Sequence, residues 1–427
     1  MGDPFPQHIH LIGINGSGMT GLAEYLLGLG KTVTGSDLNA PRDDSLTRRG
    51  ATVYRGHRSD HVNGAGLIVY SDAIPFSNAE LAEARLRDIP IIKRARCLGQ
   101  LLERAHAVAV AGSHGKSSTT TMIASVLRGS GQDVSHIVGA PASCLDHIQG
   151  RRGASRIFVA EACEAFQNLA PLSPDLALIL NIDDDHIEHY GSIEKLHDAF
   201  RDFAGRVRRG GTLIVNGDDT RARDSATSAS VTVVTYGLAG DCDVHATDIA
   251  MDGSGSTFTV TAHGRELGSL RLNIPGRHMI GNALACVAAC LALDVPFAAI
   301  ARGLEQFTGV ARRWQMLGEV DSIRLIDDYA HHPTELRAGL ETAKLSAGDS
   351  GRICIAFQPQ LYSRTRRLFA EYVEVLKGFD RVGLVEIDGA GEKNTFGVSA
   401  HHLAEALREA GKTAFVFPDV AELLQNV

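Results

Sequence analysis

An apolar strand, a glycine turn and a helix follow one another repeatedly along this chain, and this repetition constrains the fold more than any other feature. Residues 8–13 (HIHLIG) lead into a helical pattern over 18–30, and residues 105–112 (AHAVAVAG) lead into another over 116–129. Further apolar strands are predicted at 31–37, 66–74, 89–95, 156–162, 175–183 and 210–219. Strands that alternate with helices predict parallel sheets of the α/β class.

Changes in the pattern of apolar and polar residues along the chain predict three domains. At 427 residues the chain is too long for one ordinary core. Residues 231–275 contain alternating, β-rich stretches (VTVVTYG, STFTVTAH, SLRLNI), which predict an antiparallel β patch within the second domain. After residue 313, the strands in RLIDDYAHHP, GRICIAFQPQ, DRVGLVEID and TAFVFPD predict a third parallel unit. We therefore expect a Rossmann-like domain at 1–103, a P-loop ATPase-type domain at 104–309 and a second Rossmann-like domain at 310–427.

The composition excludes several classes of protein. Hydrophobic residues make up 44% and no apolar run reaches the roughly 18 residues of a membrane span, so membrane insertion is not expected. The net charge is −8 without a basic tract, so nucleic acid is not an expected partner. The N-terminus has neither the basic start nor the apolar stretch of a signal peptide, and the seven cysteines form no C-x2-C pair. We therefore expect a cytoplasmic protein.

The first glycine turn, GINGSGM at 13–19, is spaced G-x-x-G-x-G, whereas the dinucleotide-binding fingerprint is G-x-G-x-x-G. Asp37 closes the next predicted strand, about where a Rossmann unit places the acid that binds ribose. Backbone N–H groups at a helix N-terminus favour a diphosphate here. On this evidence a nucleotide site and a purely structural turn both stay open.

The second glycine turn, GSHGKSSTT at 112–120, carries a lysine and a run of hydroxyl groups. It is shorter than the P-loop pattern, because only Ser113 and His114 separate Gly112 from Gly115. The N–H groups of such a loop can cradle phosphate oxygens, Lys116 can neutralise phosphate charge, and the next hydroxyl can ligate Mg²⁺. In the alternative the hydroxyls cap the helix and the lysine is a solvated charge. The apolar strand before the turn favours the phosphate site.

Acidic residues end two of the predicted strands. Glu161 and Glu164 follow one of them, and the next ends in NIDDDHIEHY at 181–190, which contains Asp183, Asp184, Asp185, His186, Glu188 and His189. Carboxylates and a histidine at the carboxyl edge of a parallel sheet, beside a phosphate loop, are what Mg²⁺-nucleotide chemistry requires. No cysteine cluster accompanies the histidines, so Mg²⁺ is expected in preference to zinc. We expect Asp184 and Glu188 to be helix caps or solvated charges.

Basic residues and histidines gather in the last third of the chain. Arg312 and Arg313 precede DDYAHHPTE (327–335), and Arg364 lies within FQPQLYSRTRR (357–367). Arginines suit the transition-state charge on a phosphoryl group, and Arg364 can grip a carboxylate with two hydrogen bonds. The sequence leaves a site role and a structural role equally open for Tyr329, His331 and His332.

Taken in order, these stretches resemble the Mur ligases, ATP-dependent enzymes that form amide bonds in peptidoglycan precursor synthesis. The resemblance runs from residue 8 to about 419 and rests on GINGSGM, GSHGKSSTT, EACE, NIDDDHIEHYG, PGRHMIGNALA, GVARRWQ, DDYAHHPTE and FQPQLYSRT. It implies an N-terminal UDP-sugar domain, a central ATPase domain and a C-terminal Rossmann-like domain, the last of which we expect to lack its final strand. We expect a monomer or a homodimer.

The resemblance implies a set of site residues, carried over position by position. The UDP-sugar would contact Asn15, Gly16, Ser17, Gly18, Met19, Ser36, Asp37 and Ser71. ATP would contact Gly112, Ser113, His114, Gly115, Lys116, Ser117, Ser118, Asn282, Arg313 and Asp328. Mg²⁺ would be held by Ser117, Glu161 and His186. The residues that would take part in catalysis are Lys116, His186, Arg312, Arg313, His332 and Arg364.

The implied reaction joins an amino acid, expected to be L-alanine, to the carboxylate of UDP-N-acetylmuramate, with ATP and Mg²⁺ as cofactors. A carboxylate is a poor electrophile, so ATP first converts it to an acyl phosphate, which the amino group attacks as phosphate leaves. Lys116, Mg²⁺ and the arginines would compensate the developing charge. The general base is unassigned, with His332 as a candidate. Arg201 stands where later-acting family members carry a carbamylated lysine, which favours the branch that adds alanine.

Several positions depart from the family pattern. Ser113 and Ser117 replace threonine but keep a hydroxyl, and Met279 replaces an asparagine near the expected adenine site. Residues 360–361 (Gln-Leu) replace a common His-Arg, and Asp388 replaces a frequent tyrosine. The last two changes fall in the expected amino-acid and sugar region, so the resemblance does not fix the amino acid.

Other functions stay open on the sequence alone. Within the family, the alternatives are a ligase that attaches an intact recycled peptide to the same sugar nucleotide and a ligase with a different substrate. The first glycine turn permits a nicotinamide oxidoreductase, although its spacing and the Lys116 loop argue against one. The departures permit a non-catalytic nucleotide-binding regulator, which would bind ATP without turnover.

Overall fold

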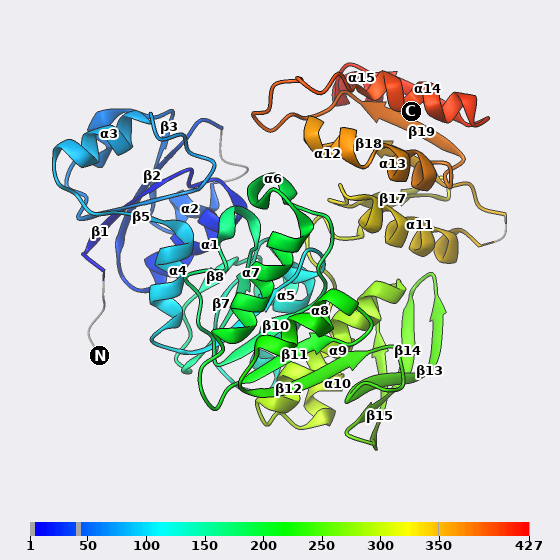
Figure 1. Cartoon of the computed structure of the whole chain (residues 1–427), viewed down its shortest axis with the longest axis horizontal. Coiled ribbons are helices and arrows are strands. Elements are labelled where there is room, and N and C mark those ends of the chain that lie inside the picture. The colour runs from blue at the N-terminus through cyan, green and yellow to red at the C-terminus, as the bar shows by residue number, and fades with distance from the viewer. Residues whose placement is uncertain (1–4, 40–43, 349, 427) are drawn as a thin grey trace. The chain divides into compact units, whose positions relative to one another are not determined.

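The computed structural model describes residues 5–39, 44–348 and 350–426 and divides into two compact units. Unit 1 holds residues up to 249 together with 258–272 and 281–311, and unit 2 holds 250–257, 273–280 and 312 onward. Figure 1 colours the chain from blue at the N-terminus to red at the C-terminus. The largest apolar cluster draws its residues from unit 1, and a separate cluster from unit 2.

The N-terminal sheet of unit 1 is parallel throughout, with the strand order β3-β2-β1-β4-β5 (Figure 1). Its strand β4 reads LIVY and is buried along most of its length, as expected where helices cover both faces of a parallel sheet. The strands are β1 His8–Ile12, β2 Thr32–Asp37, β3 Thr52–Arg55, β4 Leu67–Tyr70 and β5 Ile91–Lys93. The helices are α1 Ser17–Gly28, α2 Ser45–Arg48, α3 Ala79–Leu86 and α4 Arg94–Leu102.

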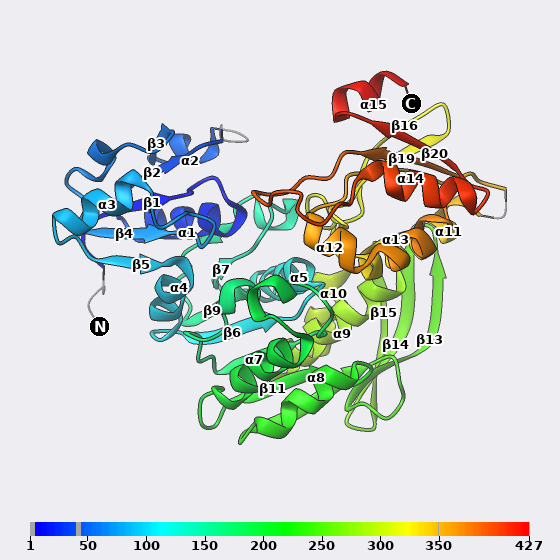
Figure 2. The same cartoon turned by 45° about the horizontal axis from the view of Figure 1, so that its top comes forward.

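The second sheet of unit 1 has the order β15-β14-β13-β12-β11-β10-β6-β9-β7-β8. Figure 2 shows β6 and β9 beside α5, the helix that follows the second glycine turn. The strands are β6 His106–Ala111, β7 Ser135–Ile137, β8 Gly150–Arg151, β9 Ile157–Ala162, β10 Leu176–Ile179, β11 Thr212–Asn216, β12 Thr232–Gly237, β13 Val244–Asp252, β14 Gly255–Ala262 and β15 Arg265–Leu272. The helices are α5 Lys116–Gly129, α6 Ile187–Tyr190, α7 Ile193–Gly205, α8 Thr220–Ser225, α9 Arg277–Ala292 and α10 Phe297–Glu305.

One expectation about this sheet was wrong. The stretch VTVVTYG was assigned to an antiparallel patch, but β12 pairs in parallel with β11 and with β13. Burial in β12 increases along the strand and does not alternate, so the alternating sequence does not report the direction of pairing. Strand β14 does alternate between buried and partly exposed side chains, as the pattern predicts.

The two sheets of unit 1 pack closely through α1. The carboxylate of Glu24 accepts hydrogen bonds from the backbone N–H groups of Gln149 (2.7 Å) and Gly150 (2.8 Å). A Cβ on Gly150 would collide with the backbone of Gly21, so this crossing requires glycine. The rings of Tyr25 and Phe158 stack with centroids 4.7 Å apart. The first glycine turn is therefore attached rigidly to the sheet that carries the second.

Unit 2 contains a parallel three-stranded sheet and a separate antiparallel hairpin. The sheet strands are β18 Cys354–Phe357, β19 Arg381–Val385 and β20 Thr413–Phe417, and the hairpin strands are β16 Gln315–Val320 and β17 Ile323–Asp327. The helices are α11 Pro333–Ala347, α12 Tyr362–Arg367, α13 Phe369–Leu376, α14 Ala400–Glu409 and α15 Val420–Asn426.

The strand in RLIDDYAHHP was expected in the parallel sheet, and this was wrong. It forms β17, which pairs with β16 across a two-residue turn in which Asp321 and Ser322 both have positive φ (49° and 65°). Two positive φ values are the mark of the hairpin turn whose twist matches that of the strands. This turn usually contains Asn-Gly or Asp-Gly, so the Asp-Ser sequence did not predict it. In the part of the chain described, no helix is long and apolar enough to cross a membrane.

Candidate functional site

The second glycine turn joins β6 to the N-terminus of α5. Gly112 and Gly115 have φ of 141° and 84°, which L-residues rarely adopt. A Cβ on Gly112 would lie 2.9 Å from the Cβ of Leu180, and one on Gly115 would lie 2.5 Å from Oδ1 of Asn282. The turn is therefore glycine-dependent at both positions. It also places Asn282, a predicted ATP contact, directly against the phosphate loop.

Lys116 is the first residue of α5, and its ammonium group is held by protein oxygens. Nζ donates to the carbonyl oxygens of Gly112 and Ser113 (3.0 Å) and lies 2.9 Å from the carboxylate of Glu164. The Glu164 side chain is fully buried, and that of Lys116 is 14% exposed. Burial alone would lower the pKa of Lys116, but the negative charge of Glu164 raises it above its usual range. The lysine is therefore a fixed cation at the helix N-terminus.

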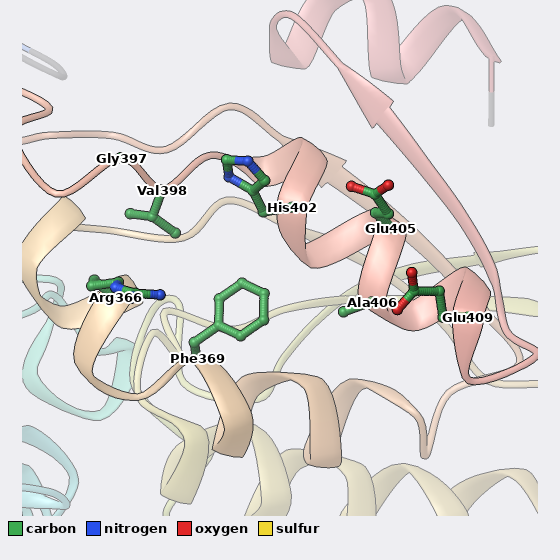
Figure 3. A pocket seen from close by; sticks show the side chains of 8 residues that line it. All are labelled: Arg366, Phe369, Gly397, Val398, His402, Glu405, Ala406 and Glu409. Atoms are coloured by element: carbon green, nitrogen blue, oxygen red, sulfur yellow. The ribbon is translucent and has the colours of Figure 1, made fainter.

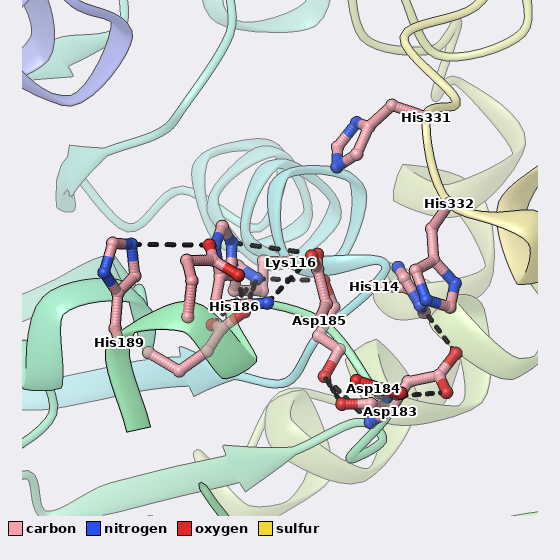
Figure 4. A network of polar contacts seen from close by, with 12 residues as sticks. His114, Lys116, Asp183, Asp184, Asp185, His186, His189, His331 and His332 are labelled. Atoms are coloured by element: carbon pink, nitrogen blue, oxygen red, sulfur yellow. Dashed lines mark hydrogen bonds and ion pairs between the residues drawn. The ribbon is translucent and has the colours of Figure 1, made fainter. Parts of the chain in front are cut away.

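The loop is also latched to the end of strand β10. The side chain of Asn181 accepts from the backbone N–H of His114 (2.7 Å) and donates to its carbonyl (3.0 Å). The ring of His114 contacts Asp183 at 3.0 Å, and the hydroxyl of Ser113 accepts from the backbone N–H of Asp183 at 2.9 Å. These contacts fix the shape of the turn. Figure 4 draws the one between His114 and Asp183.

Two of the predicted Mg²⁺ ligands converge beside Gly139. Strand pairing places Glu161 opposite Val110, at the end of β6 from which the loop departs. A Cβ on Gly139 would lie 2.7 Å from Oε2 of Glu161 and 3.0 Å from Oγ of Ser117, so both oxygens border one point. The backbone N–H of Gly139 donates to the other carboxylate oxygen of Glu161. A carboxylate and a hydroxyl suit a hard cation such as Mg²⁺.

His186 lies near Lys116 through a shared acid. Its Nε2 is 3.9 Å from Glu164 and 3.7 Å from Asp185, and its Nδ1 is 3.5 Å from Glu188. Burial alone would lower the pKa of His186, but the carboxylates of Glu188, Asp185 and Glu164 raise it. Figure 4 shows His186 beside Lys116. The structure thus brings Glu161 and His186, which are distant in sequence, to Lys116 and Ser117.

Sequence reasoning named Glu164 only as one of several acids and gave it no role. In the structure it is the buried partner of Lys116 and lies within reach of His186. The signal was its spacing of three residues from Glu161 in EACE, immediately after a strand.

The first glycine turn is held by the end of strand β2. The backbone carbonyl of Ser36 accepts from the N–H groups of Gly13 (2.8 Å) and Ile14 (3.2 Å), and Asp37 accepts from the N–H of Asn15 (3.0 Å). Gly16 precedes helix α1 and no side chain caps the N-terminus of that helix. The N–H groups at the start of α1, in Ser17 and Gly18, are thus arranged as an anion site.

Arg94 lies beside the first glycine turn, a position that the sequence did not reveal. It opens α4, and a Cβ on Gly18 would lie 3.1–3.3 Å from its guanidinium group. A cation at a helix N-terminus is unfavourable for the helix dipole unless an anion lies between them. The helix and the guanidinium together therefore suit a diphosphate. Ser71 lies against Gly13 on another side of the turn.

Ser36 has a second, internal role. Its side chain is fully buried and donates to Glu80 at 2.6 Å. Glu80 also contacts His61 (2.7 Å) and His57 (3.1 Å), and burial raises its pKa while the hydrogen bonds from His10, Ser36 and His61 bring it down to about 2. This buried acid fixes the side of Ser36 that faces away from the turn. A direct contact of Ser36 with a ligand stays a prediction, as does that of Met19, which is 2% exposed.

In unit 2, the predicted arginines surround an acid and a tyrosine. The guanidinium groups of Arg312 and Arg313 lie 4.3 and 5.4 Å from the ring centre of Tyr329. Burial raises the pKa of Asp328 to about 6, while the charge of Arg313 opposes the rise. Arg313 also lies 3.9 Å from Glu335. Two arginines, an acid and a tyrosine therefore gather at one strand end, and their contact with ATP stays a prediction.

His332 caps helix α11. Its Nδ1 accepts from the N–H of Thr334 at 3.3 Å, and Glu335 accepts in return from the N–H of His332. A neutral ring that accepts through Nδ1 carries its proton on Nε2. The role of His332 in catalysis or substrate binding stays a prediction. Arg364 is 1% exposed within α12.

The two departures from the family pattern lie side by side. Gln360 forms a parallel backbone bridge with Asp388, and the N–H of Leu361 donates to the carbonyl of Asp388 at 2.8 Å. They are therefore one local change and not two independent ones. A separate pocket of about 330 Å³ lies between α13 and α14 and contains none of the predicted site residues (Figure 3).

Comparison with known proteins gives the family. Three Mur ligase models match in order: "Mur ligase family, catalytic domain" over residues 8–106, "Mur ligase middle domain" over 110–290 and "Mur ligase, glutamate ligase domain" over 312–427. These confirm a three-domain α/β chain, while the boundaries 103/104 and 309/310 stay predictions.

Relatives that match nearly the whole chain lead to the same family. A UDP-N-acetylmuramate–L-alanine ligase of Geobacter sulfurreducens is 40% identical over 95% of this chain and 88% of its own length. One of Dechloromonas aromatica is 39% identical over 99% and 93%. The crystal structure of the UDP-N-acetylmuramate–alanine ligase of Thermotoga maritima matches with a TM-score of 0.84 at 26% identity, over 98% of this chain and 92% of that one. This chain therefore belongs to the Mur ligase family and is an ATP-dependent ligase.

Proposed function

We propose that this protein joins L-alanine to the carboxylate of UDP-N-acetylmuramate, in peptidoglycan precursor synthesis in the cytoplasm. One observation supports the proposal above the others: Lys116, Ser117, Glu161 and His186 meet at the strand ends around a glycine turn. The relatives that share nearly the whole chain carry the corresponding name.

The second glycine turn binds the phosphates of ATP in this proposal. Its N–H groups and the N-terminus of α5 receive the phosphate oxygens, and Lys116 supplies a fixed positive charge. Lys116 then exchanges its contacts with the Gly112 and Ser113 carbonyls for phosphate oxygens, while Glu164 keeps it in place. The lysine needs no proton transfer, because it is fully protonated throughout.

Ser117 and Glu161 would hold one Mg²⁺ ion and His186 a second. Bound Mg²⁺ neutralises the charge that develops on the transferring phosphoryl group. The side chains fit this role, because the hydroxyl and carboxylate oxygens border one point beside Gly139. Glu164 lies between Lys116 and His186 and so holds the two side chains in fixed positions relative to each other.

The first glycine turn binds the diphosphate of the sugar nucleotide. The N-terminus of α1 and the guanidinium of Arg94 enclose the space beside Gly18. Asp37 accepts from Asn15 N–H and from Asn39 N–H, so its carboxylate fixes the loop next to the nucleotide. The UDP part is thereby anchored away from the reacting carboxylate, which supplies binding energy for positioning.

The reaction follows in two steps. A carboxylate oxygen of the muramyl group attacks the γ-phosphorus of ATP, ADP leaves, and an acyl phosphate forms. The amine of L-alanine attacks the acyl carbon, the carbon–oxygen bond to phosphate breaks, and an amide and inorganic phosphate result. Arg312 and Arg313 suit the phosphoryl charge of the first step, and Arg364 suits the carboxylate of the incoming amino acid.

The test is a substrate panel with ATP and Mg²⁺. Phosphate release and the UDP-linked product are measured with UDP-N-acetylmuramate and L-alanine, glycine, L-serine or the intact recycled tripeptide. We expect L-alanine to give the highest kcat/KM. A preference for the tripeptide would reassign the chain to peptide recycling. ATP binding without release for any acceptor would instead make it a regulator.

A further inference from the structure

The single helical turn α6 carries three metal-ligating side chains that the proposed reaction does not need together. His186 precedes the turn and His189 lies three residues later, so both imidazoles project from one face. Their ring centres are 6.0 Å apart and nearly parallel. The longer side chain of Glu188 reaches between them and lies near a nitrogen of each ring.

The donor atoms have the spacing of a metal site. Oε1 of Glu188 lies 3.5 Å from Nδ1 of His186 and 3.5 Å from Nε2 of His189. One nitrogen of each ring and one carboxylate oxygen all lie within 4.8 Å of one another. Ligands about 2.0–2.1 Å from a tetrahedral Zn²⁺ are about 3.4 Å apart. Two of the three donor separations therefore match this spacing, and the third lies within 4.8 Å.

The site is reachable from solvent but shielded. The side chains of His186, Glu188 and His189 are 25%, 20% and 22% exposed. Glu188 was expected to be a helix cap or a solvated charge. The residue as a whole is exposed, yet its carboxylate lies between the two imidazoles. The ring of Phe166 lies 3.8 Å from that of His189 and limits its rotation. An ion could enter without unfolding, and it would find ligands that are already oriented.

We propose that His186, Glu188 and His189 bind a transition-metal ion of the Zn²⁺ type, at a site separate from the Mg²⁺ ligands Ser117 and Glu161. Two imidazoles and one carboxylate suit Zn²⁺ or Co²⁺, whereas Mg²⁺ prefers oxygen ligands alone. Three protein ligands leave a fourth position for water.

Occupation of this site switches off the proposed Mg²⁺ role of His186. A neutral imidazole has one unprotonated nitrogen, so a ring that binds Zn²⁺ through Nδ1 carries its proton on Nε2. Nε2 is the atom that faces Glu164 and Asp185. It then cannot ligate Mg²⁺, and Zn²⁺ inhibits the enzyme. This consequence rests on the proposed function, whereas binding of the ion does not.

Binding is tested on the metal-stripped full chain without nucleotide. We expect Co²⁺ to produce the visible absorption of a tetrahedral site at one equivalent, and Zn²⁺ to displace it. His189→Gln removes one ligand and is expected to weaken both ions by ~10-fold or more. His263→Gln is the matched control, because His263 also pairs with a carboxylate, Asp243 at 3.7 Å, in the same unit. Equal binding by the parent and His189→Gln would overturn the site.

Inhibition is tested by ligase turnover with saturating Mg²⁺ and increasing Zn²⁺. The parent chain and His263→Gln should lose activity together and recover when Zn²⁺ is chelated. His189→Gln should keep its activity to Zn²⁺ concentrations ~10-fold higher. Identical inhibition curves for the parent and His189→Gln would overturn the proposed switch. If the chain has no ligase activity at all, the proposed function fails, and the Co²⁺ spectrum still decides the site.

Discussion

The two glycine turns of unit 1 build an anion site in different ways. Each joins the end of a parallel strand to a helix N-terminus, where free backbone N–H groups collect. The second turn contains its own cation, Lys116, and pairs it with the buried Glu164. The first turn has no lysine, and its cation comes from Arg94 at the start of another helix. A local motif therefore supplies the cation of the second site but not the cation of the first.

The two turns are alike in what holds their shape. The first is fixed by Ser36 and Asp37 at the end of β2, and the second by Asn181 just after β10. In both cases the neighbouring strand end supplies the hydrogen bonds. Glycine permits the backbone path, but the adjacent strand selects it. The comparison predicts that each site can be damaged separately, through its cation or through its support.

The largest effect is expected at the cation inside the motif. Lys116→Ala removes the fixed charge beside the phosphates, and turnover should fall by ~10³-fold or more. It also leaves Glu164 buried without its partner, which costs up to about 3 kcal/mol of stability. Phosphate release and thermal unfolding measure the two effects.

A double variant separates them. Lys116→Met with Glu164→Gln replaces the buried pair by neutral groups of similar size, so the melting temperature should recover while turnover does not. Recovery of turnover along with stability would mean that the lysine only supports the fold.

The support of the first turn is expected to show in the pH dependence of stability. Burial would raise the pKa of Glu80, but its hydrogen bonds lower it from 4.5 to about 2. A lowered pKa contributes stability that is present above the unfolded value and is lost as pH falls toward the folded value. Glu80→Gln should therefore cost at most about 3 kcal/mol at pH 7, and the difference from the parent should vanish between pH 4.5 and pH 2.

Urea unfolding of both chains across this range measures the difference. A gap between the two chains that is unchanged down to pH 2 would show that charge on Glu80 plays no part. Asn181 does not ionise, so Asn181→Ala in the support of the second turn serves as the pH-independent control.

Arg94, the cation that another helix supplies to the first turn, is expected to affect the binding of one substrate only. Arg94→Ala should raise the KM for UDP-N-acetylmuramate by about 10- to 100-fold, because a charge-assisted contact to the diphosphate is worth about 1.5–3 kcal/mol. The KM for ATP should stay nearly unchanged. Arg96→Ala, an exposed arginine on the same helix, is the matched control. A parallel rise in both KM values would place Arg94 in the general fold of unit 1.

The comparison also explains what could be predicted from the sequence. The strand–turn–helix order and the eight family motifs led to the fold, the ligase class and the Lys116 site. Arg94 was not predicted because it belongs to no motif and meets Gly18 only through a tertiary contact. The hairpin β16–β17 was not predicted because Asp321 and Ser322 both adopt positive φ values although neither is a glycine.

The smallest effect is expected at Asn181, whose side chain holds the backbone of the second turn. Asn181→Ala removes one acceptor and one donor from the backbone of His114, so the loop loses its fixed shape but keeps Lys116. The KM for ATP should rise by about 10-fold, which corresponds to one or two ordinary hydrogen bonds. Asn181→Asp keeps the acceptor and should show a smaller rise. If both variants bind ATP like the parent, the glycines alone would set the loop, and the likeness between the two turns would fail.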